Sequence, residues 1–167
     1  MTELLSTELP DTLERDVRAF LEAACERELR LATAESCTGG MLASLLTDVE
    51  GSSHAFDRGF VVYTDEAKTA MLDVPAEMIA EHGAVSRPVA IAMAEGGLAR
   101  SDADIALSVT GFAGPAGEEN EEGLVHFACA REGRETIHRE AHYGAIGRGP
   151  IRIECIKAAI EMMGEML

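Results

Sequence analysis

Runs of apolar residues along the chain change period from segment to segment, and this change predicts alternating helices and strands. Apolar residues keep helical spacing from Asp11 to about residue 29, and Asp11 with Glu14 forms the pattern of a capping box at the start. Short, nearly continuous apolar runs predict buried strands at 29–34, 59–64 and 104–110.

The remaining segments continue the alternation. Helices are predicted after Gly40, after Thr64, over a short stretch between Pro75 and Gly83, and from Ser86 onward. Residues 124–130 and 135–143 predict a β-hairpin joined by REGR, and a final helix is predicted from about Pro150.

Helices that alternate with buried strands, followed by one hairpin, predict an α/β fold. We expect a three-layer α/β/α sandwich with a mixed, mostly parallel sheet and one antiparallel hairpin. The chain shows no linker, internal repeat or low-complexity segment, so residues 1–167 are predicted to form a single domain. A length of 167 residues is enough for a sizeable core.

Charge narrows the possible partners. The formal net charge is −16, and aromatic residues make up only 4% of the chain, so nucleic acid and anionic membranes are not expected as partners. No apolar run approaches the ~20 residues of a membrane helix, and the first residues are acidic, unlike a signal peptide. A cytoplasmic protein is expected, with Cys25, Cys37, Cys129 and Cys155 as free thiols.

The sequence AESCTGG, residues 34–40, lies between a predicted strand and a predicted helix. Such a turn groups backbone N–H donors with a helix dipole, which suits an anion or an oxyanion beside a nucleophilic Ser36. The loop matches neither the G-x-S-x-G elbow nor a phosphate-binding loop. Taken alone, it fits a simple turn better, in which Ser36 or Thr38 caps the helix and the glycines are packing contacts.

Two further strand ends carry candidate chemistry. Tyr63 ends a predicted strand, and Lys68, one of only two lysines, lies about one turn into the next helix, where the helix dipole lowers a lysine pKa. A lysine of lowered pKa can act as a general base for a serine, although a solvated surface lysine is the ordinary alternative. Thr110 opens a glycine-rich loop that suits either a ligand or a tight turn.

Basic and histidine residues complete the list of candidates. Arg148 and Arg152 are four residues apart, which suits a phosphate or carboxylate ligand, or else ordinary surface ion pairs. If Ala130 pairs with Glu135, His126 faces opposite to the other two hairpin histidines, and a slip of one residue reverses this. No metal site is predicted.

Taken together, these segments resemble one family. AESCTGG (34–40), GSSHAFDRGFVVYTDEAK (51–68), GAVSRPVAIAMAEG (83–96), ADIALSVTGFAGPAG (103–117) and the late arginine pair occur in the order found in the C-terminal domain of the competence/damage-inducible protein CinA. Active members of that family are nicotinamide mononucleotide deamidases. The resemblance implies an amidohydrolase that converts nicotinamide mononucleotide to nicotinate mononucleotide and ammonia, without a metal or organic cofactor.

The resemblance also implies roles for individual residues. Ser36 is implied as nucleophile, Lys68 as its base and Tyr63 as a second proton-relay or orienting group. The implied substrate-binding residues are Thr38, Gly39, Gly40, Thr110, Gly111, Arg148 and Arg152. The family further implies self-association into a homo-oligomer, and the only other partner expected is the small nucleotide substrate.

Two positions depart from the family pattern. The loop after GPAG is short and acidic (Glu118–Glu122), where relatives often have Lys-Pro-Val, and Gly147 stands where relatives tend to have Asp. Both positions are near the expected phosphate end of the site. Two alternatives therefore stay open: an amidase for another small carboxamide, and a catalytically inactive nucleotide-binding module.

Overall fold

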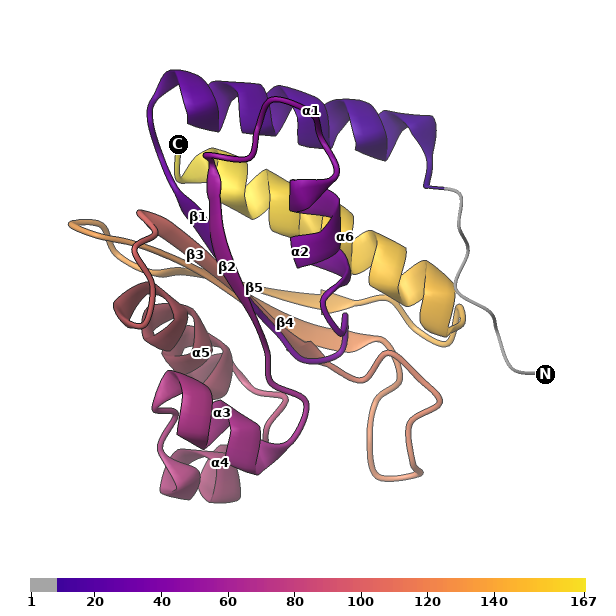
Figure 1. Ribbon diagram of the computed structural model, residues 1–167. Helices are drawn as coiled ribbons and strands as arrows, with labels where there is room; N and C mark the ends of the chain where they lie inside the picture. Colours follow the sequence, from indigo (N-terminus) through magenta and orange to yellow (C-terminus); the bar gives the residue numbers. More distant parts are fainter. Residues whose placement is uncertain (1–8) are drawn as a thin grey trace.

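In the computed structural model, which describes residues 9–167, five strands form one central sheet (Figure 1). The strand order is β2-β1-β3-β4-β5. The β2–β1 and β1–β3 pairs are parallel, whereas β3–β4 and β4–β5 are antiparallel. The strands are β1 (Leu31–Glu35), β2 (Phe56–Val61), β3 (Ile105–Gly111), β4 (Leu124–Arg131) and β5 (Ile137–His142).

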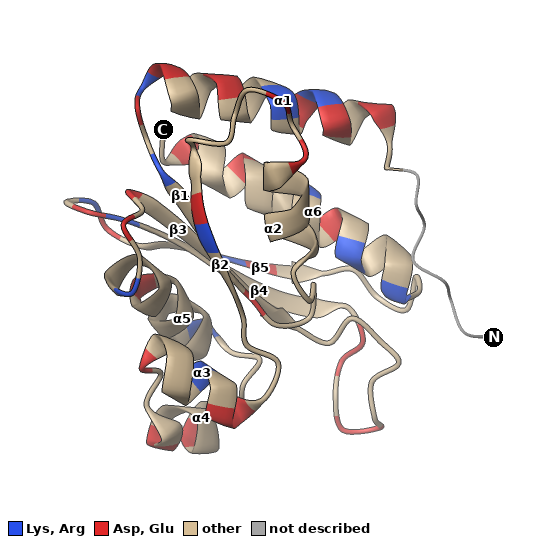
Figure 2. Ribbon diagram, viewed as in Figure 1, with Lys and Arg blue, Asp and Glu red and all other residues tan. Residues whose placement is uncertain are grey.

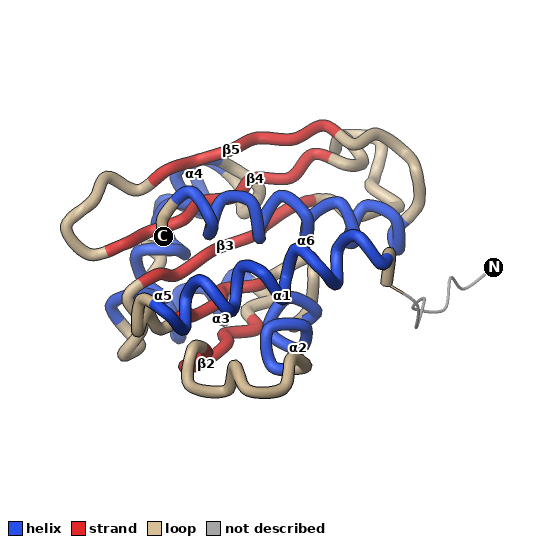
Figure 3. The backbone as a smooth tube through the Cα atoms, turned by 90° about the horizontal axis from the view of Figure 1, so that it is seen from above, coloured by secondary structure: helices blue, strands red, loops and turns tan. Residues whose placement is uncertain are grey.

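Helices cover both faces of this sheet. One face carries α1, α2 and α6, and the other carries α3, α4 and α5, as Figures 1 and 3 show from two directions. The helices are α1 (Asp11–Glu26), α2 (Met41–Thr47), α3 (Asp65–Leu72), α4 (Ala76–His82), α5 (Arg87–Ala99) and α6 (Arg148–Glu165). The expected three-layer sandwich with a mixed sheet and one hairpin is confirmed. None of the helices in the described part of the chain is long and apolar enough to cross a membrane.

Alternation along the strands divides the core between the two faces. Odd-numbered residues of β3 and β4, such as Leu107 and Phe127, pack against α1, α2 and α6 in the larger cluster. Ala128 and Ala130, at even positions of β4, pack against Ala90 and Ala94 of α5. Small side chains on both surfaces let α5 lie close to the sheet.

The structure corrects several boundaries. Pro10, not Asp11, is the N-cap of α1 and no side chain caps it, so the predicted capping box does not form. The buried strand expected at 59–64 is β2, which spans Phe56–Val61 instead. It lies at the edge of the sheet, and half of its residues are exposed. Parallel and antiparallel pairings are equal in number, so the sheet is evenly mixed instead of mostly parallel.

The hairpin has the slipped register. His126 pairs with Glu140, and Ala128 pairs with His138, one residue away from pairing Ala130 with Glu135. His126 and His138 therefore share a face of the sheet, and their ring nitrogens Nδ1 and Nε2 lie 3.0 Å apart. The position of a turn within REGR cannot be fixed by the apolar pattern, because one residue more or less in the turn reverses every side chain.

Candidate active site

The candidate site lies at the edge of the sheet where β1 and β3 end. Ser36 directly follows β1, and its backbone N–H donates to the Val109 carbonyl at 3.0 Å, which holds the residue against β3. Its side chain is almost completely buried, with 8% of the residue exposed. A hydroxyl in this position is sheltered from bulk water and lies where β1 passes into the loop before α2.

Lys68 provides the basic group beside this hydroxyl. It lies in the first half of α3, which Thr64 caps by accepting a hydrogen bond from the Ala67 N–H, as the sequence predicts. Lys68 is 1% exposed, and its Nζ donates to Ser36 Oγ at 3.1 Å. Two backbone carbonyls, those of Val62 at 3.1 Å and Tyr63 at 3.4 Å, accept its other hydrogen bonds. No carboxylate forms an ion pair with this amine among the described residues.

The environment of Lys68 favours its neutral form. Burial lowers the pKa of the Lys68 ammonium below its ordinary value, and the nearby Asp65 and Cys37 act in the opposite direction. The predicted direction is therefore confirmed, but its main cause is burial and not the helix dipole. A neutral amine 3.1 Å from a serine hydroxyl can accept the hydroxyl proton.

Two of the four backbone N–H groups in the turn at residues 37–40 have acceptors, in Ser36 and in Glu35. Gly39 and Gly40 have φ of +59° and +93°, conformations that other residues rarely adopt. The Gly39 N–H donates to the Ser36 carbonyl, and the Gly40 N–H donates to Glu35 Oε2. The N–H groups of Cys37 and Thr38 have no acceptor within residues 9–167, so they are the donors available beside the serine.

Helix α6 begins at Arg148, two residues earlier than expected, so Arg148 and Arg152 both lie in its first two turns. Arg148 Nη1 donates to the Gly114 carbonyl at 3.0 Å. Arg152 Nη2 donates to the Thr38 carbonyl, and its Nε is buried without a partner in the described structure. Arg152 therefore supports the serine loop, whereas Arg148 lies beside the glycine-rich loop that follows β3.

The other predicted residues differ in how they face the site. Thr110 is buried, and its hydroxyl donates to the Ala84 carbonyl at 2.9 Å. Gly111 permits close pairing with β4, because a Cβ there would lie 2.7 Å from the Val125 side chain. Tyr63 is 66% exposed, and only its carbonyl contacts Lys68. The structure thus brings Ser36 and Lys68 into direct contact, whereas the Tyr63 hydroxyl forms no hydrogen bond with either.

Glu35 is a site residue that the sequence reasoning missed. It is completely buried at the end of β1, directly before the serine. The available signal was a carboxylate inside an apolar strand, since Glu is rarely fully buried unless its charge is compensated.

Three of the four thiols, those of Cys37, Cys129 and Cys155, are buried. No group of three or more His, Cys, Asp or Glu side chains within residues 9–167 could hold a metal ion. Burial raises the pKa of the Cys129 thiol to about 12, and a hydrogen bond with the Cys37 side chain, together with burial, raises the pKa of Cys155. Cys37 is buried beside Ser36 and belongs to the apolar core on the α6 side.

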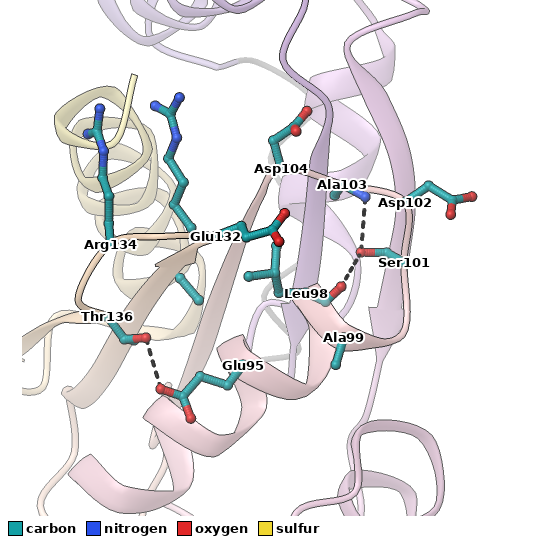
Figure 4. Close-up of a pocket in the computed structure, with 12 residues that line it drawn as sticks. Glu95, Leu98, Ala99, Ser101, Asp102, Ala103, Asp104, Glu132, Arg134 and Thr136 are labelled. Carbon is teal, nitrogen blue, oxygen red and sulfur yellow. Dashed lines mark hydrogen bonds between the residues drawn. The ribbon is translucent and has the colours of Figure 1, made fainter.

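A cavity of about 650 Å³ lies at the other end of the sheet, where β3 begins (Figure 4). Two polar groups in its wall are already paired. The Thr136 hydroxyl donates to Glu95, and the Ser101 hydroxyl donates to the Leu98 carbonyl. Arg131 and Arg134 donate to carbonyls at the end of α6. Since the Ser36–Lys68 pair lies at the opposite edge, this cavity is not part of the candidate site.

The fold and the site together define an α/β sandwich domain with a buried serine–lysine pair at the carboxyl edge of its parallel strands. The chain belongs to the CinA C-terminal domain family, whose model matches residues 13–167. The expected family is therefore confirmed.

Similar proteins include one of nearly equal length. The nicotinamide-nucleotide amidohydrolase PncC of Escherichia coli is 43% identical over 144 residues, which cover 85% of this chain and 87% of that protein. A putative competence-damage inducible protein of Symbiobacterium thermophilum is 56% identical over 127 residues, covering 75% of this chain and 29% of the relative. The chain spans 26% to 37% of the length of the larger relatives that it matches.

A solved structure supports the architecture. The competence/damage inducible protein CihA from Agrobacterium tumefaciens superposes with a TM-score of 0.91 at 44% sequence identity. The match covers 94% of this chain and 96% of that one.

Proposed function

We propose that this protein is an amidohydrolase that converts nicotinamide mononucleotide to nicotinate mononucleotide and ammonia. The observation that carries the proposal is the buried contact of 3.1 Å between Lys68 Nζ and Ser36 Oγ. The similarity to PncC of E. coli, whose name gives this substrate class, supports the choice of amide.

The acylation step uses both residues. The neutral Lys68 amine accepts the Ser36 proton as Oγ attacks the carboxamide carbon, giving a tetrahedral oxyanion. The Lys68 ammonium then gives this proton to the departing nitrogen, the C–N bond breaks, and ammonia leaves. The product is an ester between Ser36 and the nicotinoyl group.

Deacylation repeats the chemistry with water. Lys68 accepts a proton from water, whose oxygen attacks the ester carbon, and the proton returns to Ser36 Oγ as the C–O bond breaks. We assign the oxyanion to the free N–H groups of Cys37 and Thr38, since the amides of Gly39 and Gly40 already have acceptors. One such donor contributes about 3 kcal/mol to transition-state stabilisation in comparable sites.

Arg148 is proposed as the phosphate ligand. It lies at the start of α6, where its guanidinium reaches the Gly114 carbonyl at the same edge of the sheet as Ser36. Arg152 is assigned a supporting role, because it already donates to the Thr38 carbonyl. A guanidinium at this position supplies the local positive charge that an anionic substrate needs on a protein of net charge −16.

The decisive measurement is ammonia release from purified protein supplied with nicotinamide mononucleotide. Ser36→Ala should lose essentially all turnover and keep its circular dichroism spectrum. Ser44→Ala, which changes an exposed serine on α2, is the matched control and should retain wild-type turnover. Substantial turnover by Ser36→Ala would exclude Ser36 as the nucleophile.

The alternative substrate is another small carboxamide, different from nicotinamide mononucleotide. The side chain of Glu122, in the acidic loop, packs over Gly114, the residue whose carbonyl accepts from Arg148. A carboxylate beside the residue that Arg148 contacts disfavours a phosphate there. A panel of small carboxamides with and without phosphate distinguishes the two substrates, since the alternative requires faster turnover of an amide without phosphate.

A further inference from the structure

The Glu35 carboxylate organises the turn that carries the proposed nucleophile. Both of its oxygens accept hydrogen bonds from the residues that follow Ser36. Oε2 accepts from Thr38 Oγ1 at 2.6 Å, from the Gly40 N–H at 3.2 Å and from the Leu42 N–H at 3.0 Å. Oε1 accepts from the Ala43 N–H at 2.8 Å.

These contacts explain how a carboxylate is tolerated in the core. Glu35 is 0% exposed, and no basic side chain pairs with it within residues 9–167. Its compensation comes from three N–H groups and one hydroxyl at the start of α2, which otherwise has no side-chain cap. Hydrogen bonds from N–H groups to a carboxylate are strong, and leaving such a group unpaired inside the protein is costly.

The same contacts decide which donors remain for a substrate. The Thr38 hydroxyl and the Gly40 N–H, which belong to two of the residues implied to bind substrate, are used by Glu35. An anion therefore cannot bind at the start of α2, because the chain's own carboxylate already occupies that place. Of the N–H groups in residues 36–43, those of Cys37 and Thr38, within the turn that Glu35 braces, are the two without an acceptor in the described part of the chain.

We propose that Glu35 is a positioning residue for the reaction: it fixes the turn so that Ser36 meets Lys68 and the two free amides face the oxyanion that forms at the reacting carbon. It touches neither the substrate nor the reacting atoms. The turn is held at three points, by Glu35 from within, by the Ser36 N–H on Val109, and by Arg152 on the Thr38 carbonyl. The expected effect of Glu35 on catalysis rests on the proposed function, whereas its expected effect on the conformation of the turn does not.

Glu35→Gln tests the proposal with little change in size. A glutamine keeps one acceptor oxygen but places an NH₂ group against backbone N–H donors. Some of the hydrogen bonds that hold the turn are therefore lost. We expect kcat to fall by about 10- to 100-fold, the scale that a displacement near 1 Å produces, while KM for nicotinamide mononucleotide stays within about twofold. Glu50→Gln removes an exposed carboxylate just after α2 and should leave both constants unchanged.

Hydrogen–deuterium exchange gives a readout that needs no turnover. In Glu35→Gln, exchange should become faster in peptides covering residues 36–43, whereas peptides from β3 and α5 should keep wild-type protection. Wild-type kcat in Glu35→Gln, or unchanged exchange in residues 36–43, would overturn the proposal. A fall in kcat with lost protection throughout the chain would also overturn it, because that result describes general unfolding.

The two proposals can fail separately. If the wild-type protein releases no ammonia from the mononucleotide, the proposed function fails, and a serine-directed fluorophosphonate probe replaces the substrate. Labelling of Ser36 that is at least tenfold slower in Glu35→Gln, together with faster exchange in residues 36–43, then supports the positioning role. Equal labelling rates or equal exchange would overturn it.

Discussion

At the scale of single residues, the site depends on burying a lysine without a carboxylate partner. Lys68 donates to one hydroxyl and two carbonyls, which are neutral acceptors. Neutral acceptors compensate a desolvated ammonium less well than a carboxylate does, so burial lowers the pKa of Lys68. The charge that most directly opposes this effect is Asp65, at the start of the same helix.

The pH dependence of turnover follows from this balance. Lys68 must be neutral to accept the Ser36 proton, so kcat/KM should rise with pH through the lowered pKa of Lys68. Asp65→Asn removes a charge that raises this pKa, and the rising limb should therefore move to lower pH. The measurement is kcat/KM from pH 5 to 10 for both proteins.

Glu66→Gln is the matched control for that profile. Glu66 is the exposed neighbour of Asp65 and does not contribute to the pKa shift of Lys68. Its profile should overlay that of the wild type. A rising limb that moves to higher pH in Asp65→Asn, or does not move, would contradict the assignment of this limb to Lys68.

How far single residues can be predicted from sequence depends on what their function requires. Ser36 and Lys68 stand out because a serine in a glycine turn and a rare lysine at a helix start are unusual locally. Glu35 is marked in the sequence as a carboxylate at the end of an apolar strand, but its role depends on donors up to eight residues away that only the folded turn brings together. Likewise, Arg152 looks like half of a phosphate clamp in sequence, but in the fold it reaches back to Thr38.

At the scale of elements, the order of helices and strands follows from apolar periodicity, but their pairing does not. The hydrophobic pattern cannot distinguish the two hairpin registers. It predicts a buried strand at 59–64 because GFVVYT is a nearly continuous apolar run. The sheet order places β2 at an edge, where its neighbour on one side is missing. Such long-range relations depend on the whole packing and not on local sequence.

The close packing of α5 against α3 predicts that a side chain at Gly96 destabilises the protein. A Cβ added at Gly96 of α5 would lie 2.0 Å from the Leu72 carbonyl of α3, so Gly96→Ala must push these helices apart. We expect the free energy of unfolding to fall by about 1 to 3 kcal/mol, measured by urea denaturation. Because Lys68 lies on α3, turnover should fall as well.

Gly164→Ala is the contrasting variant. Gly164 is exposed within α6, and nothing lies within 4 Å of an added Cβ. Alanine should raise the free energy of unfolding there by up to about 1 kcal/mol, through its higher helix propensity. If both variants destabilise the protein equally, helix spacing at Gly96 is not the cause.

At the scale of the whole molecule, the negative field and the proposed substrate are in conflict. Acidic residues are spread over the outer helices, and others lie in the loop after β3, as Figure 2 shows. The mononucleotide phosphate carries more negative charge than the pyridinium ring carries positive charge, so the net field repels it. Arg148 opposes this repulsion only at short range.

Salt should therefore improve binding of the substrate. The screening length falls from about 30 Å at 0.01 M salt to about 8 Å at 0.15 M, which removes the distant repulsion but leaves most of a direct contact with Arg148. We expect KM for nicotinamide mononucleotide to decrease over this range while kcat stays constant. Steady-state kinetics in sodium chloride at fixed pH measure the effect.

Paired charge variants locate the source of the repulsion. Glu118→Gln with Glu119→Gln removes two exposed charges from the loop beside the Arg148 contact, and Glu22→Gln with Glu26→Gln removes two from α1. The end of α1 that bears the second pair lies away from this loop in Figures 1 and 3. At 0.01 M salt the loop variant should lower KM more than the α1 variant does, because the effect of a charge falls with distance.

A KM that rises with salt in the wild type would mean that the local Arg148 contact outweighs the net field. Equal effects of the two variants would mean that the acidic loop has no special influence on the site.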